Sequence, residues 1–293
     1  MTQADYDVLK NLDIETIPFS KRIEAFYEGT RAAADLAQQV MIPQLKALMN
    51  PSRKEEILKG LYFRMYAWMR TLVSLNDTVH FQAAASATRS IFELLLDIKL
   101  IMDDNPKGAI QKFNAFVEVE KFRMAKGYVD FKNRNPALRY VGDRGKENLV
   151  NKQGEQERIE KLRALHWGND SKGRPIIPKH WSGWPTNKRA EEAGKHDEFF
   201  YCASFGLLSW YTHSGPTGVQ GMSKEALEAV FGNSHMLAQP MFLDATLLVA
   251  KEFKLITAIP QLTDRIKEAG LAVGTVILDE HIKQLKDLEN KKG

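Results

Sequence analysis

Three charged side chains recur every fourth residue within an otherwise apolar stretch of the sequence. The stretch runs from His80 to Asp103 without Gly or Pro and carries Arg89, Glu93 and Asp97. On an α-helix this spacing places the three side chains on one face, and buried charges are costly unless they are paired or used. The pattern leaves two interpretations open: a salt-bridge network that fixes helix packing, or a site in which Arg89 holds an anion beside carboxylates that orient a base or bind a cation.

A hydroxyl and an imidazole form a second pair, because Ser209 and His213 lie four residues apart near the end of an apolar helical pattern. The helix dipole favours a charged His at that end. His213 is therefore either a C-terminal cap of the helix, or a general base or anion contact at the mouth of a cleft. The GxSxG turn that carries the nucleophile of many hydrolases is absent, so the spacing alone is weak support for a Ser/His nucleophile pair.

The longest predicted loop, 168–185, contains three Pro, three Gly and two Trp. Long loops without secondary structure are usually functional or disordered, and the Trp and Ile content argues against disorder here. Its centre reads HWSGW, with His180, Trp181 and Ser182 as candidate ligand-binding residues. We expect this aromatic segment either to cover a pocket and stack on a base, or to seal the helical core as an anchored plug.

Sequence motifs for common cofactor chemistry are missing. The chain has no P-loop, no GxGxxG, no HExxH and no CxxC, and its seven His show no tight metal-ligand spacing. We therefore expect no cofactor and no metal. The alternative is a metal site assembled from His213 with Glu93 and Asp97.

Charge is distributed unevenly along the chain, whose net charge is +4. The range 121–189 contains 17 Lys and Arg against 7 Asp and Glu, whereas the rest of the chain contains 24 against 30. We expect this basic segment either to face RNA or another polyanion, or to be a solvated connecting region.

Composition also indicates the compartment. A single cysteine, Cys202, excludes a disulfide framework, so we expect a protein of the reducing cytoplasm. The N-terminal residues carry early acids and no apolar stretch of the kind found in signal peptides. No run of about 18 apolar residues is present, so we expect no membrane span. A homo-oligomer is compatible with these features.

The hydrophobic pattern predicts an all-α fold of about eight to ten helices packed around a buried central helix, 78–103. We expect three parts along the chain. These are an N-terminal helical segment, 1–75, a core helical domain that contains the long loop, 76–258, and a C-terminal helix or tail, 259–293.

Local signals predict several details of these helices. Pro43 should kink or break the first long helix. One polar helix should run from Glu147 to His166. Gly232 and Asn233 should interrupt the helix that begins after Ser223.

Several of these motifs occur in the same order in a family of bacterial helical proteins. An R-x3-E helix, a W-S-G loop leading into a short helix, and an S-x3-H helix end together resemble the domain of unknown function 5677 family over about residues 78–221. The family name implies no activity. The resemblance implies that eight residues belong to one site: Arg89, Glu93, Trp181, Ser182, Gly183, Tyr201, Ser209 and His213.

A weaker resemblance is to HEPN-type helical ribonucleases, which cleave RNA without metal through an Arg and a His spaced R-x4–6-H on one helix. In such proteins the His handles the 2′-OH proton and the Arg steadies the phosphate. This sequence departs from the pattern, because Arg163 and His166 are too closely spaced and Arg89 and His213 lie on different predicted helices. A ribonuclease of this type therefore requires that Arg89 and His213 meet in the fold.

These observations lead to one leading hypothesis and two alternatives. The leading hypothesis is an internal polar site of Arg89, Glu93, Ser209 and His213 that binds an anionic ligand, nucleic acid or nucleotide. The first alternative is a metal-independent ribonuclease of a defence or toxin system, with His213 as base and Arg89 as phosphate clamp. The second is an interaction module whose polar network only fixes helix packing. The residues expected to contact the ligand are His180, Trp181, Ser182, Tyr201 and Asp97.

Overall fold

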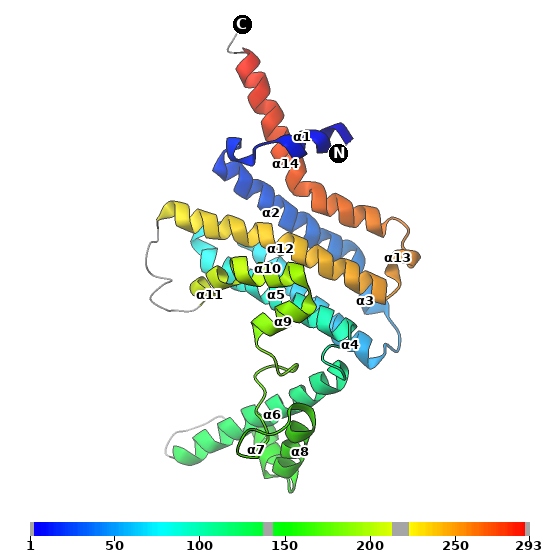
Figure 1. Ribbon diagram of the computed structural model, residues 1–293, viewed down its shortest axis with the longest axis vertical. Helices are drawn as coiled ribbons and strands as arrows, with labels where there is room; N and C mark the ends of the chain where they lie inside the picture. The colour runs from blue at the N-terminus through cyan, green and yellow to red at the C-terminus, as the bar shows by residue number, and fades with distance from the viewer. Residues whose placement is uncertain (1–2, 137–142, 213–222, 291–293) are drawn as a thin grey trace. The chain divides into compact units, whose positions relative to one another are not determined.

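The computed structural model describes residues 3–136, 143–212 and 223–290 (Figure 1). Within these ranges every regular element is a helix, and the only extended pairing is an isolated bridge between Asn169 and Pro175. The predicted all-α fold is confirmed, with several short helices in addition to the eight to ten expected. Among the described residues no helix has the length and apolarity needed to cross a bilayer.

The chain divides into two compact units, which we describe separately: Met1–Lys99 with Lys195–Gly293, and Leu100–Gly194. The three-part division expected from the sequence stays a prediction. The helices of the first unit are α1 (Gln3–Asn11), α2 (Phe19–Leu36), α3 (Ile42–Ala47), α4 (Arg53–Ser74), α5 (Phe81–Met102, up to Lys99), α10 (Lys195–Phe200), α11 (Gly206–Thr212), α12 (Lys224–Glu252), α13 (Leu255–Ala258) and α14 (Leu262–Asn290).

Side-chain caps explain where two long helices begin. Ser52 and Glu55 form a capping box at α4, in which the Ser52 hydroxyl accepts from the Glu55 N–H over 3.3 Å and the Glu55 carboxylate accepts from the Ser52 N–H over 2.6 Å. The Ser223 hydroxyl caps α12 by accepting from the Ala226 N–H over 3.2 Å. Each cap satisfies a backbone donor that the helix itself leaves without a partner.

Two π-helical turns lie within otherwise α-helical segments. Ala37–Met41 joins α2 to α3, and Tyr201–Phe205 joins α10 to α11. Pro43, where the sequence predicts a kink, is the second residue of α3, which begins directly after the first π turn. Such turns widen the helix locally and are frequent at functional sites.

The core of the first unit forms where α2 packs against α4, α12 and α14. Gly29 of α2 permits the close approach, because a Cβ at this position would lie 2.5 Å from Cγ2 of Val273 in α14 and 2.8 Å from the side-chain oxygen of Gln239 in α12. Gln239 in turn donates from Nε2 to the backbone carbonyl of Ala269 over 2.7 Å. The packing of these helices therefore depends on one small residue and one satisfied buried amide.

α5 is buried along most of its length, as its apolar sequence predicts. The ring of Phe92 lies 4.4 Å from that of Phe200 and 5.7 Å from that of Phe205, measured between centroids, so that α5 packs against the segment formed by α10 and the second π turn. On α12, the backbone carbonyl of Ser234 accepts from the Thr88 hydroxyl over 2.9 Å. α5 is thus held by two neighbours that lie more than 90 residues further along the chain.

The second unit is smaller and contains α6 (Ala109–Arg134), α7 (Arg144–Asn151), α8 (Glu155–Trp167) and α9 (Thr186–Ala193). α6 packs against α7 and α8. A small core of Val119, Phe122 and Ile159 joins α6 to α8. The long loop connects α8 to α9.

Two local predictions are wrong, and both concern glycines. The polar helix expected from Glu147 to His166 is divided between α7 and α8, because Gly154 adopts a left-handed conformation with φ +75°. α12 continues without interruption through Gly232 and Asn233. A Cβ at Gly232 would lie 3.1 Å from Cγ1 of Ile23, so this glycine allows close packing of two helices instead of ending one.

Candidate functional site

The charged stripe of α5 is partly open to solvent. Arg89 Nε donates to Glu93 Oε1 over 3.1 Å, and the two side chains are 23% and 34% exposed. Asp97 lies one turn further along the helix and is half-buried. An exposed pair at this spacing stabilises a helix by only about 0.5 kcal/mol, so this ion pair contributes little to the stability of the fold.

The second π turn supplies aromatic neighbours for this stripe. The guanidinium carbon of Arg89 lies 5.0 Å from the ring centroid of Phe205, which is the geometry of a cation–π contact. The ring of Tyr201 stacks on the same Phe205 ring with 5.1 Å between centroids. The structure therefore brings Arg89, Glu93 and Tyr201 to one region of the first unit.

The hydroxyl of Ser209 is engaged within its own helix, since Oγ donates to the backbone carbonyl of Phe205 over 2.8 Å. The Thr212 hydroxyl, at the end of α11, lies 3.4 Å from that of Ser86 on α5. His213 lies outside the described residues. The meeting of Arg89 with His213, on which the sequence-based ribonuclease hypothesis depends, stays a prediction.

The remaining predicted site residues, His180, Trp181 and Ser182, belong to the second unit. The convergence of all predicted residues on a single site also stays a prediction. Within the second unit, however, the long loop has a defined conformation and forms a cavity of its own.

The first half of the loop folds around Asp170. Its Oδ1 accepts from the backbone N–H of Arg174 over 2.9 Å, and its Oδ2 pairs with the Arg174 guanidinium over 2.9 Å. Both hydrogen bonds lower the pKa of the Asp170 carboxyl, and the one from the backbone N–H has the larger effect. Arg163 of α8 then anchors the following residues, donating from Nε to the backbone carbonyl of Ile176 over 3.0 Å. Arg163 is therefore used to hold the loop.

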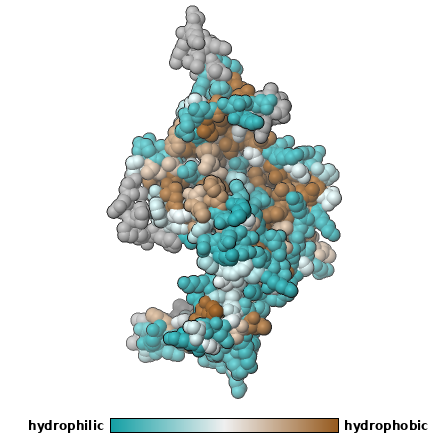
Figure 2. Space-filling view, in the orientation of Figure 1, coloured by the Kyte–Doolittle hydropathy of each residue, from teal (hydrophilic) through white to brown (hydrophobic). Residues whose placement is uncertain are grey.

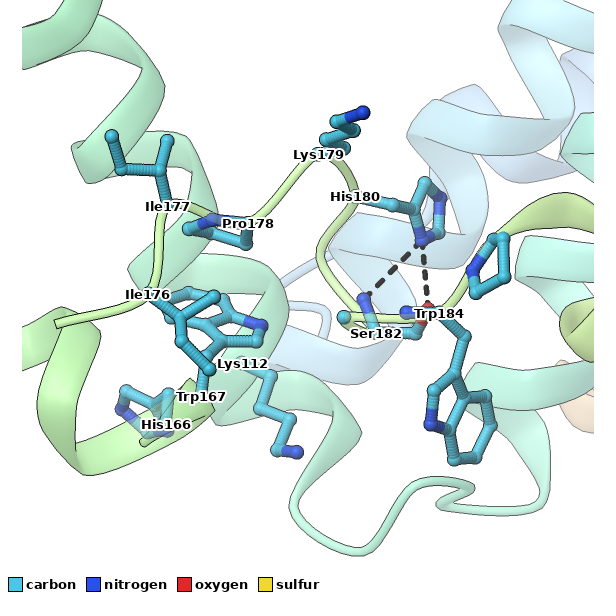
Figure 3. Close-up of a pocket in the computed structure, with 12 residues that line it drawn as sticks. Lys112, His166, Trp167, Ile176, Ile177, Pro178, Lys179, His180, Ser182 and Trp184 are labelled. Carbon is cyan, nitrogen blue, oxygen red and sulfur yellow. Dashed lines mark hydrogen bonds between the residues drawn. The ribbon is translucent and has the colours of Figure 1, made fainter. Parts of the chain in front are cut away.

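The second half of the loop is a tight turn centred on Ser182, which is only 2% exposed. Ser182 Oγ accepts from the backbone N–H of Trp184 over 3.1 Å and lies 2.9 Å from Nδ1 of His180 (Figure 3). Gly183 has a φ of +81°, and a Cβ there would lie 2.9 Å from Cδ1 of Trp167. Both the conformation and the available space require glycine, so the W-S-G sequence builds this turn.

Two tryptophans fix the turn to the rest of the unit. Trp167, the last residue of α8, donates from Nε1 to the backbone carbonyl of Trp181 over 3.0 Å. The Trp181 side chain is 2% exposed, and its ring lies 6.0 Å from that of Phe113 on α6. Trp181 is thus part of the packing that supports the turn.

The hydrogen bonds of the turn determine the tautomer of neutral His180. The backbone N–H of Ser182 donates to His180 Nδ1 over 3.3 Å, and an N–H group can only donate. Nδ1 is therefore the acceptor, and the neutral ring carries its proton on Nε2. The Ser182 hydroxyl, 2.9 Å from the same nitrogen, donates to it as well.

A cavity of about 420 Å³, which we call the loop pocket, opens beside this turn (Figure 3). Its polar lining is basic: Lys112 from α6, Lys179 from the loop, and the imidazoles of His166 and His180. The pKa of His166 is lowered mainly by burial and to a smaller extent by the positive charge of Lys112. This ring is therefore neutral at pH 7. None of the described residues that line the pocket is acidic. The apolar part of the lining includes Trp167, Trp184, Ile176 and Ile177.

This lining suits a ligand that is anionic at one end and flat or apolar at the other. Ammonium groups neutralise phosphate or carboxylate oxygens. Indole faces accept stacked bases, at about 1–3 kcal/mol per base. The charge of the whole unit supports the same ligand class, because Leu100–Gly194 carries 19 Lys and Arg against 13 Asp and Glu.

Sequence reasoning identified His180 and Ser182 but missed three cationic or titratable groups of the loop pocket, Lys112, His166 and Lys179. Lys179 directly precedes the HWSGW segment, so its position in the sequence was a usable signal. Lys112 is more than 60 residues away on α6, and nothing in its local sequence distinguishes it from other lysines.

Comparison with known proteins gives a family and no activity. A model of the family of unknown function DUF5677 matches residues 55–225. The match covers more than half of the 293 residues and includes the R-x3-E helix, the W-S-G loop and the S-x3-H helix end. No curated protein and no solved structure matches the chain.

Proposed function

The chain belongs to the DUF5677 family, whose function is unknown, and we propose that it binds a nucleoside phosphate in the loop pocket, either as a free nucleotide or at the end of an RNA strand. The observation that carries this proposal is the combination of two lysines, two imidazoles and two indoles around one cavity. The size of the cavity, about 420 Å³, is within the usual range for small-molecule sites.

Each part of such a ligand has a suitable partner in the loop pocket. The ammonium groups of Lys112 and Lys179 are suited to phosphate oxygens. The rings of Trp167 and Trp184 offer faces for a base. Since each phosphate contact by a Lys displaces counterions, binding should weaken as the salt concentration rises.

The direct test is a titration followed by tryptophan fluorescence and by calorimetry. Three of the five tryptophans, Trp167, Trp181 and Trp184, lie in or beside the loop pocket, so a bound base should change the emission. The ligands are adenosine, adenosine monophosphate and a short RNA with and without a 5′-phosphate. We expect the phosphorylated member of each pair to bind at least tenfold more tightly.

Matched variants locate the binding. Lys179→Gln removes a charge that lines the loop pocket, whereas Lys172→Gln removes an exposed charge from the same loop outside it. Lys179→Gln should weaken binding and reduce the salt dependence by about one counterion, and Lys172→Gln should leave both unchanged. Absence of binding, or equal effects of the two variants, would contradict the proposal.

A metal-independent ribonuclease centred on the stripe of α5 is the second candidate. It is favoured by the Arg89 guanidinium, which is held on the Phe205 ring while its side chain remains 23% exposed. Thr212, the residue before His213, lies 3.4 Å from Ser86, one turn before Arg89 on α5. In this candidate His213 takes the 2′-OH proton as the 2′-oxygen attacks phosphorus, and Arg89 stabilises the phosphate charge. The bond from phosphorus to the 5′-oxygen breaks, which leaves a 2′,3′-cyclic phosphate, and the departing 5′-oxygen takes a proton from water.

RNA cleavage in the presence of EDTA tests this second candidate. Loss of cleavage in both Arg89→Ala and His213→Ala, with an unchanged circular dichroism spectrum and with Lys179→Gln still active, would support it. No cleavage by the unaltered protein would exclude it and leave the binding proposal to be decided by the titrations. A large fall in melting temperature of both variants would instead indicate that the stripe fixes helix packing.

We further propose that the protein acts in the bacterial cytoplasm. The single cysteine, Cys202, is exposed and free, which is typical of proteins in a reducing compartment. Fractionation of cells that produce the protein, followed by detection with an antibody, would test this location.

A further inference from the structure

Lys99 pairs with two carboxylates in the first unit. Its Nζ lies 2.9 Å from Oδ2 of Asp197 and 2.7 Å from Oδ2 of Asp244. Burial by itself lowers the pKa of Lys99, but the hydrogen bonds to Asp244 and Asp197 outweigh burial and raise it, so the ammonium stays charged at neutral pH. Within this group of Lys99, Asp197 and Asp244, two carboxylates face one ammonium, so one negative charge is in excess.

The two carboxylates differ in what they can still bind. The Asp197 side chain is 3% exposed, and both of its oxygens already accept from Lys99. The Asp244 side chain is 41% exposed, and Lys99 contacts its Oδ2. A carboxylate has two oxygens and about four lone-pair positions, so Asp244 retains acceptor capacity for another cation.

Beside this group lies a cavity of about 350 Å³ with mainly apolar walls, which we call the α12 cavity. Among the described residues, its polar lining consists of Asp197, Asp244, the exposed His196 of α10 and the half-buried Ser204 of the second π turn. Its apolar lining includes Phe92, Leu95, Phe200, Leu237 and Met241.

Two helix irregularities explain why side chains do not fill this space. Pro240 lies inside α12 and lines the cavity. It has no N–H for the usual bond to the carbonyl four residues earlier, and its ring clashes with that carbonyl, which distorts the helix locally. Facing it is the π turn Tyr201–Phe205, whose Ser204 also lines the cavity. Irregular turns on both sides keep the helices from meeting as closely as regular ones would.

The surroundings of the cavity are also apolar. Phe199 of α10 lines the cavity and is 69% exposed, and Figure 2 shows hydrophobic surface in the region of α10 on the first unit. Exposed apolar surface next to a preformed apolar cavity is typical of ligand sites.

We propose that the α12 cavity binds a small molecule with an aromatic or aliphatic body and a primary ammonium group, with the ammonium on Asp244. The body replaces water against the apolar walls. The ammonium supplies the missing positive charge, so that two carboxylates face two ammonium groups. A carboxylate-bearing ligand of the same shape is repelled, since it would raise the excess negative charge from one to two.

The test is calorimetric titration of the full-length protein with three ligands that share one skeleton: 2-phenylethylamine, 2-phenylethanol and phenylacetate. We expect 2-phenylethylamine to bind at least tenfold more tightly than 2-phenylethanol and phenylacetate to bind more weakly than either. Equal binding of the three ligands, or no binding of the amine, would overturn the proposal.

Three variants assign the binding to the α12 cavity. Asp244→Asn keeps the shape of a half-exposed side chain and should abolish the preference for the amine over the alcohol. Leu237→Trp should fill the cavity and remove binding of all three ligands. Met236→Trp, on the neighbouring exposed position of the same helix, should leave binding unchanged.

Two results with these variants would contradict the proposal. Amine binding that survives in Leu237→Trp, or a preference for the amine that survives in Asp244→Asn, would place the ligand elsewhere and overturn the proposal. Circular dichroism and the melting temperature of each variant establish that it is folded. Because the α12 cavity and the loop pocket lie in different units, this test and the nucleotide test succeed or fail separately.

Discussion

His235 should make the protein lose stability as the pH falls below about 6.5. The imidazole is fully buried in the first unit, with Nδ1 3.1 Å from the Thr30 hydroxyl and Nε2 without a hydrogen-bond partner among the described residues. Its ring neighbours are Tyr27 and Phe231, at 5.5 and 4.7 Å between centroids. Burial lowers the pKa of His235 to about 4, because the charged form would lose its hydration.

The sign and size of the effect follow from proton linkage. The pKa is about 6.5 in an unfolded chain and about 4 in the folded one, so between these values the unfolded state binds a proton that the folded state does not. The contribution of neutral His235 to the free energy of unfolding is therefore fully present above pH 6.5 and is lost as the pH falls toward 4. The loss is about 2 kcal/mol between pH 7.5 and pH 5, and approaches about 3 kcal/mol below pH 4.

The assay is urea unfolding followed by circular dichroism at pH 7.5 and pH 5, for the unaltered protein and for His235→Gln. We expect the unaltered protein to lose about 2 kcal/mol more than the variant over this interval. His80→Gln changes an exposed imidazole and should behave like the unaltered protein. An NMR titration of the His235 ring gives the pKa directly and needs no variant. A ring that titrates near 6.5, or equal pH dependence with and without His235, would refute the reasoning.

Two further predictions concern packing and charge in the first unit. Gly29→Ala should lower the free energy of unfolding by about 1–3 kcal/mol, since its Cβ would lie 2.5 Å from Val273. Gly60→Ala, at an exposed helical position with nothing within 4 Å, should raise it by about 0.5–1 kcal/mol; urea unfolding compares the two, and effects of the same sign would contradict the packing argument. Lys99→Met should cost about 3–5 kcal/mol, because Asp197 would be left buried without its partner, and an unchanged melting temperature would show that this pair is not structurally required.

Sequence patterns were sufficient for features whose cause is local. Helical periodicity depends on residues three and four apart, so the all-α class and the buried α5 could be predicted from spacing alone. The capping residue Ser223 acts on a backbone group three positions away, which is why the start of α12 agrees with the sequence. The order of motifs along the chain likewise indicated the family, and the match over residues 55–225 confirms it.

The structural roles of two glycines could not be predicted from the neighbouring sequence. Gly154 and Gly232 look equivalent in the sequence, yet one separates two helices and the other lies inside a continuous helix. At Gly232 the need for a glycine comes from Ile23, a residue more than 200 positions away, which occupies the space that a side chain would need. No spacing rule within the segment contains that contact.

The candidate sites also contain residues that the local sequence identifies and residues that only the packing of helices brings together. His180 and Ser182 could be identified from the loop sequence, because the turn that orients them is made within a few residues. The position of Lys112 from α6 beside them in the loop pocket, and the sharing of Lys99 by Asp197 and Asp244 beside an apolar cavity, depend on how the helices pack. Such groupings depend on contacts between segments far apart in the chain. Those contacts are set by the packing of whole helices, and the spacing of residues along the sequence does not encode them individually.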